Sequence, residues 1–128
     1  MSVVWWMHGT GEGGKTLTNI VRTHKENLLL YDQISKLDRW HVLSPMVQLV
    51  IVVNIFEKVS FADMRSITHI DRLIIRDNLQ KLLDLGSLAG EWKKSEKTKV
   101  WEMYYSVSYN SRIFSDNLLI ELVKGLDE

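Results

Sequence analysis

Eight residues near the start of the chain have the types and spacing for phosphate chemistry. Gly9 to Thr16 reads G-T-G-E-G-G-K-T, matches the phosphate-loop pattern G-x-x-x-x-G-K-[ST], and follows the short β-prone run Val3–Met7. In such a loop the backbone amides wrap the phosphates, the lysine reaches the terminal ones and the threonine binds magnesium. However, no second strand ends in an aspartate suited to the metal, since the apolar run Val50–Val53 is followed by Asn54. We therefore expect a flexible glycine-rich segment and no cofactor, with nucleotide binding as the third hypothesis.

A second set of candidate residues is polar or basic and lies between residues 60 and 99. Arginine reads guanine edges with two hydrogen bonds and asparagine does so for adenine, so Arg72, Arg76 and Asn78 suit contacts with the bases of duplex DNA. Lysines between residues 93 and 99 suit the backbone or minor groove, where they supply affinity with little sequence choice. The full candidate DNA-binding set is Ser60, Arg65, His69, Arg72, Arg76, Asn78, Lys81, Lys93, Lys94, Lys97 and Lys99. The alternative is a solvated helix face with intrahelical ion pairs, followed by a merely soluble loop.

Composition excludes several kinds of chemistry. The chain has 128 residues, enough for one domain, and it has no cysteine, which excludes thiolate metal sites and cysteine nucleophiles. Its four histidines, at positions 8, 24, 41 and 69, are scattered, and no Ser–His–Asp set can be assembled. We expect no metal site and no enzyme activity. Sixteen basic and sixteen acidic residues give a net charge of zero, which argues mildly against strong non-specific binding to nucleic acid. The apolar runs of the chain are too short to span a bilayer, and its first residues lack the basic start of a secretory signal. We therefore expect a soluble cytoplasmic protein with no membrane segment.

The elements that must position the candidate residues lie between Ser44 and Ser108. Ser44-Pro45 is a helix start, and the apolar run Met46–Lys58 after it is predicted to be a helix covered on two sides, with a buried strand as the competing interpretation. Ser60-Phe61-Ala62-Asp63 has the spacing of a capping box and starts a short second helix. A third helix runs from His69 to Leu85 (70–85 as the DNA-contacting part) and stops at Gly86.

A hairpin is predicted after this glycine. The strands are Ser87–Lys94 and Val100–Ser108, and the charged tip between them carries lysines. In the second strand Trp101, Met103, Tyr105 and Val107 alternate with polar or smaller residues, which predicts one buried face and one wet face. The five tryptophans of the chain are expected to be core or interface anchors rather than base-stacking platforms.

Further helices are expected on both sides of this unit. The spacing from Tyr31 to Trp40 suits one face of a leading helix, and the tail Ser111–Leu126 suits a trailing helix capped by Ser111 or Ser115. The apolar stripe Ile113–Leu126 must pack on the leading helix, on a second subunit, or on both. The predicted fold class is therefore α+β, mainly α: a winged helix–turn–helix with extra N- and C-terminal helices. Residues 1–23 form an N-terminal segment and 24–128 the domain, with its core at 44–108.

The segment Ser60–Ser108 resembles the winged helix–turn–helix transcription regulators of the ArsR/MarR-like superfamily, including small archaeal members. The resemblance rests on Val59–Met64, on Asn78–Leu88 with its L-x-x-L-x-x-x-G ending, and on the aromatic return strand Val100–Val107. One position departs from the family's pattern. The family usually has a small polar residue on the recognition helix three positions before Leu79, and this chain has Arg76 there. The resemblance implies a homodimer, joined through the Tyr31–Trp40 and Ile113–Leu126 helices, that binds double-stranded DNA with helix 70–85 in the major groove. The second hypothesis is a winged helix that contacts proteins in a transcription, replication or segregation complex.

Overall fold

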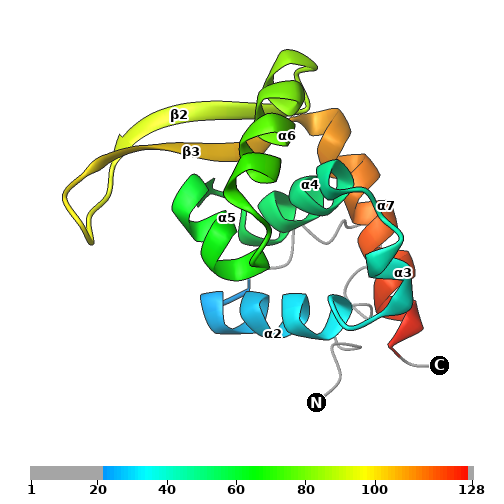
Figure 1. Ribbon diagram of the computed structural model, residues 1–128. Coiled ribbons are helices and arrows are strands. Elements are labelled where there is room, and N and C mark those ends of the chain that lie inside the picture. The colour runs from blue at the N-terminus through cyan, green and yellow to red at the C-terminus, as the bar shows by residue number, and fades with distance from the viewer. Residues whose placement is uncertain (1–21, 127–128) are drawn as a thin grey trace.

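The chain folds into a set of helices with one small antiparallel sheet. The computed structural model describes residues 22–126, so the Gly9–Thr16 segment lies outside the described residues. The elements in chain order are α2 (His24–Ile34), α3 (Asp38–His41), α4 (Pro45–Phe56), β1 (Val59–Ser60), α5 (Phe61–Thr68), α6 (Arg72–Asp84), β2 (Leu88–Lys94), β3 (Trp101–Val107) and α7 (Tyr109–Gly125) (Figure 1). This order confirms the predicted fold class, with helices on both sides of a winged-helix unit.

Helix α4 lies at the centre of the molecule. The hydroxyl of Ser44 accepts a hydrogen bond from the Val47 amide at 3.3 Å, and Pro45 occupies the first turn. Seven consecutive residues, 49–55, are buried, because α4 is covered on two sides. One side packs with α2, α3 and α7, and the other packs with α5, α6 and the sheet. The helix prediction is thereby confirmed and the buried-strand interpretation is wrong, since two-sided burial outweighs the low helix propensity of the β-branched residues.

The connection from α4 to β1 contains a strained residue. Glu57 has φ 69° and ψ −55°, and the Lys58 amide donates a hydrogen bond to the Phe56 carbonyl at 2.8 Å. A bond between residues two apart around a positive φ defines a γ-turn, which is uncommon for a residue with a Cβ. This tight turn brings β1 back against β3.

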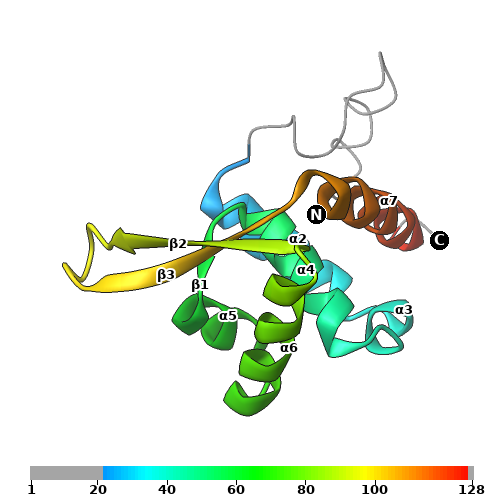
Figure 2. The same cartoon turned by 90° about the horizontal axis from the view of Figure 1, so that it is seen from above.

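The sheet has the strand order β1-β3-β2, and both pairings are antiparallel. Leu88 pairs with Val107 next to the core, and Lys94 pairs with Trp101 at the far end. Figure 2 shows the β2–β3 hairpin extending past α5, away from the body of the molecule. The prediction that one whole face of β3 is buried is therefore wrong. Val107 is buried, but Trp101 is 62% exposed, because the hairpin leaves the helices that would cover its outer half.

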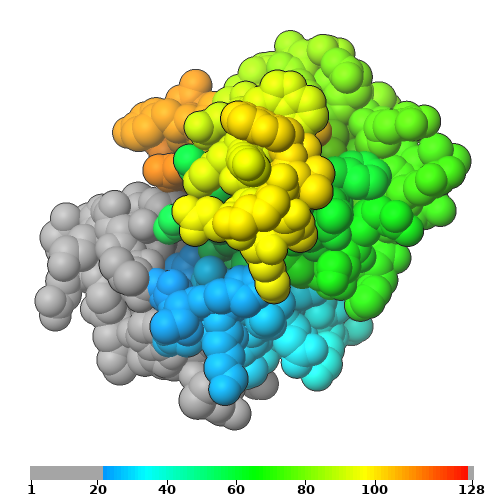
Figure 3. Space-filling model, turned by 90° about the vertical axis from the view of Figure 1, so that its left-hand side faces the viewer, coloured from blue at the N-terminus to red at the C-terminus, as the bar shows by residue number. Residues whose placement is uncertain are grey.

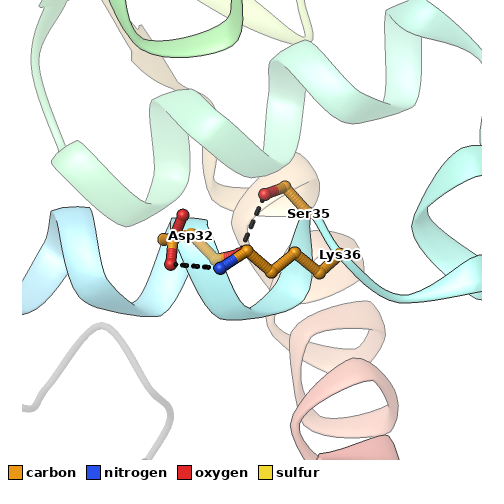
Figure 4. Close-up of polar contacts among 3 residues, drawn as sticks. All are labelled: Asp32, Ser35 and Lys36. Atoms are coloured by element: carbon orange, nitrogen blue, oxygen red, sulfur yellow. Dashed lines mark hydrogen bonds and ion pairs between the residues drawn. The ribbon is translucent and has the colours of Figure 1, made fainter.

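The predicted single helix from Tyr31 to Trp40 is interrupted. Helix α2 ends at Ile34, Leu37 is extended, and α3 starts at Asp38. The Ser35 hydroxyl donates to the Asp32 carbonyl at 3.0 Å, and the Lys36 ammonium pairs with the Asp32 carboxylate at 3.0 Å (Figure 4). The turn nevertheless returns Trp40 to Tyr31, whose rings meet edge to face at 5.7 Å. Helical spacing therefore predicted that these residues lie on one side, but it predicted neither the break nor the contact of the two rings.

Two further helix boundaries differ from the prediction. Helix α7 is capped by Ser108, whose hydroxyl accepts from the Ser111 amide, whereas the proposed cap Ser115 is fully buried inside the helix. Helix α6 begins at Arg72 rather than at residue 69 or 70, because Asp71 caps it. Gly86 follows α6 with φ 73°, the left-handed conformation expected of the residue after a helix. Within residues 22–126, no helix is long and apolar enough to cross a membrane.

Candidate nucleic-acid interface

Three residues, 69–71, form the turn between α5 and α6, and side chains fix its shape. His69 adopts the left-handed conformation with φ 58°, and its amide donates to the Arg65 carbonyl. Thr68 donates its hydroxyl to the Met64 carbonyl at 2.6 Å and accepts the Ile70 amide at 3.2 Å. Asp71 then caps α6 by accepting the Leu73 amide at 2.9 Å. The orientation of α6 relative to α5 is therefore set by bonds within the turn and does not depend on a partner.

The structure brings four predicted residues together at the start of α6. Arg65, His69 and Arg72 border one shallow hollow on the surface. Arg72 and Arg76, one turn apart, border a second hollow with Phe61 and Leu73. All four predicted residues are exposed, and no ion pair within residues 22–126 involves any of the three arginines. Their guanidinium donors are therefore available to an anionic ligand.

Asn78 and Lys81 do not join this group. Helix positions advance by about 100° per residue, which places Asn78 about 160° and Lys81 about 140° round the axis from Arg76. Asn78 also donates its side-chain amide to the Ile74 carbonyl of its own helix at 2.8 Å. The predicted reading face is thus divided between two flanks of α6, and the flank with Arg72 and Arg76 is the basic one.

Acidic residues on α6 have local partners or face solvent. Asp71 is used as the cap, and Asp84 accepts a hydrogen bond from Gln80 at 3.0 Å. Asp77 is exposed next to Arg76 in the chain. The intrahelical ion pairs of the alternative interpretation are absent from α6 in the part of the chain described.

The four lysines of the wing are all exposed, as predicted. Lys93 and Lys94 end β2, and Lys97 and Lys99 lie in the tip (Figure 3). The tip is closed by backbone bonds between Ser95 and Val100 and between Lys99 and Ser95, at 2.9 and 2.8 Å. A two-stranded base therefore carries these charges away from the body. In Figure 3 the hairpin projects towards the viewer, with α5 and α6 beside it on the right.

Ser60 differs from the other predicted site residues. It is 3% exposed, and its hydroxyl accepts the Asp63 amide at 3.1 Å in the predicted capping box. Its side chain positions α5 and is not at the surface, so it does not belong to the candidate interface.

Sequence reasoning missed a groove and an exposed aromatic surface. The groove, of about 980 Å³, runs between α2, the ends of α4 and α5, and the wing tip, and its lining includes His24, Tyr31, Trp40, Asp63 and Lys97. Partial burial raises the pKa of the Tyr31 hydroxyl above its ordinary value. No local sequence signal could have revealed this groove, since the residues that line it are far apart in the chain. Among the described residues, no group of histidine and carboxylate side chains is placed to hold a metal ion.

The exposed aromatic surface that was missed consists of Trp92 and Trp101 in the wing, at 64% and 62% exposure. The tryptophans are expected to be core or interface anchors. Trp40, which is 4% exposed, lies in the core, whereas Trp92 and Trp101 do not, so for these two the interface role stays a prediction. Trp5 and Trp6 lie outside the described residues. The outer half of the hairpin has no helix beneath it, and sequence alternation alone could not show this.

Helices α4, α5 and α6 followed by the β2–β3 wing define a winged helix–turn–helix fold. Two solved structures share it: BpsR of Bordetella bronchiseptica, whose DNA binding is described as regulated by 6-hydroxynicotinic acid, and a mutant of MarR from E. coli. BpsR is 13% identical, with a TM-score of 0.50 over 81% of this chain and 74% of its own. MarR is 12% identical, with a TM-score of 0.50 over 99% of this chain and 80% of its own.

At 13% and 12% identity, these structures confirm the winged helix–turn–helix fold that the resemblance implied. Membership of the ArsR/MarR-like superfamily, and the likeness to its small archaeal members, stay predictions. No family model and no curated protein sequence matches the chain.

Proposed function

We propose that the protein is a DNA-binding regulator of transcription and not an enzyme. In this proposal the start of α6 enters the major groove of double-stranded DNA, and the wing lysines contact the backbone or the adjacent minor groove. The observation that carries the proposal is the group Arg65, His69, Arg72 and Arg76, exposed on α5, the turn and the first turns of α6, on a fold shared with BpsR and MarR. Bidentate contact of an arginine with guanine is the specific interaction that this group suits best.

The proposed regulator acts as a homodimer that matches a pseudo-palindromic site. The flanking helices are the proposed interface, but most of their apolar residues already pack within one chain. Leu30, Ile34, Leu119, Leu122 and Val123 all lie in the cluster that α4 completes. The dimer proposal therefore rests on the start of α7, where Tyr109, Ile113 and Phe114 are 76%, 42% and 51% exposed.

Binding of labelled duplex DNA across a series of salt concentrations tests the proposal. A pool of random duplexes enriched by repeated binding supplies the preferred site. The association constant should fall steeply with salt, because arginine and lysine displace counterions from phosphates. Replacing both Arg72 and Arg76 with alanine should weaken binding to the enriched site by about 100-fold, at one base contact each. Unchanged binding of this variant would contradict a reading role for α6.

One observation favours a second candidate, a winged helix that contacts other proteins. Leu73 and Ile74 are 51% and 43% exposed on the first turns of α6, and Asp77 follows them. An apolar surface with a carboxylate suits a protein partner better than a phosphate backbone. Failure of the unaltered protein to bind any duplex at low salt would favour this candidate.

A further inference from the structure

The two exposed tryptophans lie on the same face of the wing. In an antiparallel pair, directly opposed residues point to the same side, as do residues two apart along a strand. Trp92 pairs with Met103, and Lys94 pairs with Trp101. Two rungs closer to the body, Leu88 and Val107 on this face are buried in the core. The face formed by Trp92, Lys94, Trp101 and Met103, called here the tryptophan face, therefore continues the core side of the sheet beyond the helices.

Both indole rings are open to a ligand. Neither stacks on another aromatic ring within residues 22–126, where the ring contacts are His24–Phe56 and Tyr31–Trp40. Met103 bends towards Gly90, since a Cβ at Gly90 would lie 2.7 Å from the Met103 sulfur. The methionine thus packs along the hairpin and leaves the two tryptophans exposed as broad flat surfaces.

Charge is divided unequally between the two faces of the hairpin. The tryptophan face carries Lys94 and no carboxylate along its strands. The opposite face holds Glu91, Glu102 and Lys93, and Glu91 pairs with Lys58 at 3.3 Å. The tip beyond the tryptophan face carries two lysines, Lys97 and Lys99, and one carboxylate, Glu96, and so adds a net positive charge. The side with the flat rings is therefore also the basic side of the strands.

Flat aromatic rings beside exposed lysines that outnumber the nearby carboxylate match a ligand with anionic groups and exposed π-faces. We propose that the tryptophan face binds single-stranded nucleic acid, with Trp92 and Trp101 stacking on unpaired bases and with Lys94, Lys97 and Lys99 contacting the phosphates. The bases of an intact duplex are already stacked, and inserting a ring between them costs several kcal/mol, so unpaired bases fit this face better. A protein partner fits less well. Four side chains bury on the order of 500 Å², below the roughly 800 Å² per partner of a stable interface.

This site is separate from α6, so its test is separate from that of the proposed regulator. Fluorescence anisotropy of a labelled oligothymidylate of about ten nucleotides measures binding, with oligouridylate as a second probe. We expect Trp92→Ala and Trp101→Ala each to weaken binding by about tenfold or more. Trp92→Phe and Trp101→Phe should retain most of it, because a ring remains. Weaker binding of either probe by both alanine variants supports the site. The probe that binds with the lower dissociation constant shows whether the site prefers DNA or RNA.

Matched variants separate stacking from charge and from the duplex site. Lys93→Ala removes the same charge as Lys94→Ala but from the opposite face, so it should weaken binding less. The Arg72→Ala, Arg76→Ala pair should leave oligothymidylate binding unchanged, whether or not it alters duplex binding. Far-ultraviolet circular dichroism should be unaltered for every wing variant, since these side chains lie outside the core.

Two results would overturn the proposal. One is unchanged oligonucleotide binding by the protein with both tryptophans replaced by alanine. The other is no binding of either probe by the unaltered protein at low salt. A loss of oligomeric mass in the double variant, together with unchanged binding, would instead identify the tryptophan face as a contact between copies of the chain.

Discussion

The side-chain amide of Asn54 donates a hydrogen bond to the carboxylate of Asp116 at 2.8 Å, and both residues are almost completely buried, at 2% and 3% exposure. The same amide also donates to the Ser115 hydroxyl at 3.0 Å. These bonds join the middle of the chain to its last helix across 62 residues. Arg22 lies at this junction too. Burial lowers the pKa of its guanidinium, and the negative charges of Glu57 and Asp116 offset only part of this effect.

Replacing Asn54 with leucine should reduce the free energy of unfolding by about 3 kcal/mol, because Asp116 and Ser115 lose a buried donor. Asp116→Leu should also destabilise the fold. The variant with both changes should lose less than the two single losses added, since neither polar group is then left without the other. Urea denaturation gives all three values, and simple additivity would show that the two side chains act independently.

Glu57 allows a test of backbone strain. Its φ of 69° costs free energy for any residue with a Cβ and almost none for glycine. Glu57→Gly should therefore be more stable than Glu57→Ala by about 1 kcal/mol. The alanine variant is the matched control, because both changes remove the same charge. Equal thermal midpoints for the two variants would argue against the γ-turn.

Tyrosine titration should make the fold sensitive to alkali. Burial raises the pKa of Tyr31 and of Tyr105 above the ordinary value of 10.0. Because the unfolded chain then releases these protons at lower pH than the folded one, their contribution is complete below pH 10 and is lost as pH rises through the folded pKa values. Urea midpoints above pH 10 should fall less steeply for the double Tyr→Phe variant. An identical fall would exclude these hydroxyls as the cause.

The proposed dimer depends on Phe114, an exposed aromatic residue near the start of α7. Phe114→Asp should convert the dimer into single chains, because a carboxylate would be buried at the interface without a partner. Sedimentation equilibrium measures the mass. Leu85→Asp, at a residue 70% exposed near the end of α6, introduces the same charge outside the flanking helices and should leave the mass unchanged. A single-chain mass for the unaltered protein would remove the dimer from the proposal.

Local motifs predicted more of this fold than periodicity did. The caps at Ser44 and Ser60 and the stop at Gly86 depend on a few neighbouring residues, and each is found as expected. Periodicity across Tyr31–Trp40 and along β3 instead indicated which residues share a side. It could not show a turn within the period, nor whether another element lies beneath a strand.

The candidate site shows the same division. Residue type correctly indicated an exposed basic group at α6 and the wing. Helix geometry alone places Asn78 and Lys81 away from Arg76, and this could have been applied to the sequence. The tryptophan face depends on the register of the hairpin and on the extent of the body beneath it, which are properties of the folded chain.

Helix α4 supplies one wall to each of two hydrophobic clusters, through Ile51, Val52 and Ile55 on one side and Leu49, Val50 and Val53 on the other. Neither cluster is closed without it, so the winged-helix half and the flanking-helix half of the molecule are not separate folding units. A truncation that removed α7 would expose one side of α4 to solvent. The other side of α4 would still be needed to complete the winged-helix core. The same helix therefore connects α2 and α7 to α6 through packed side chains on its two sides.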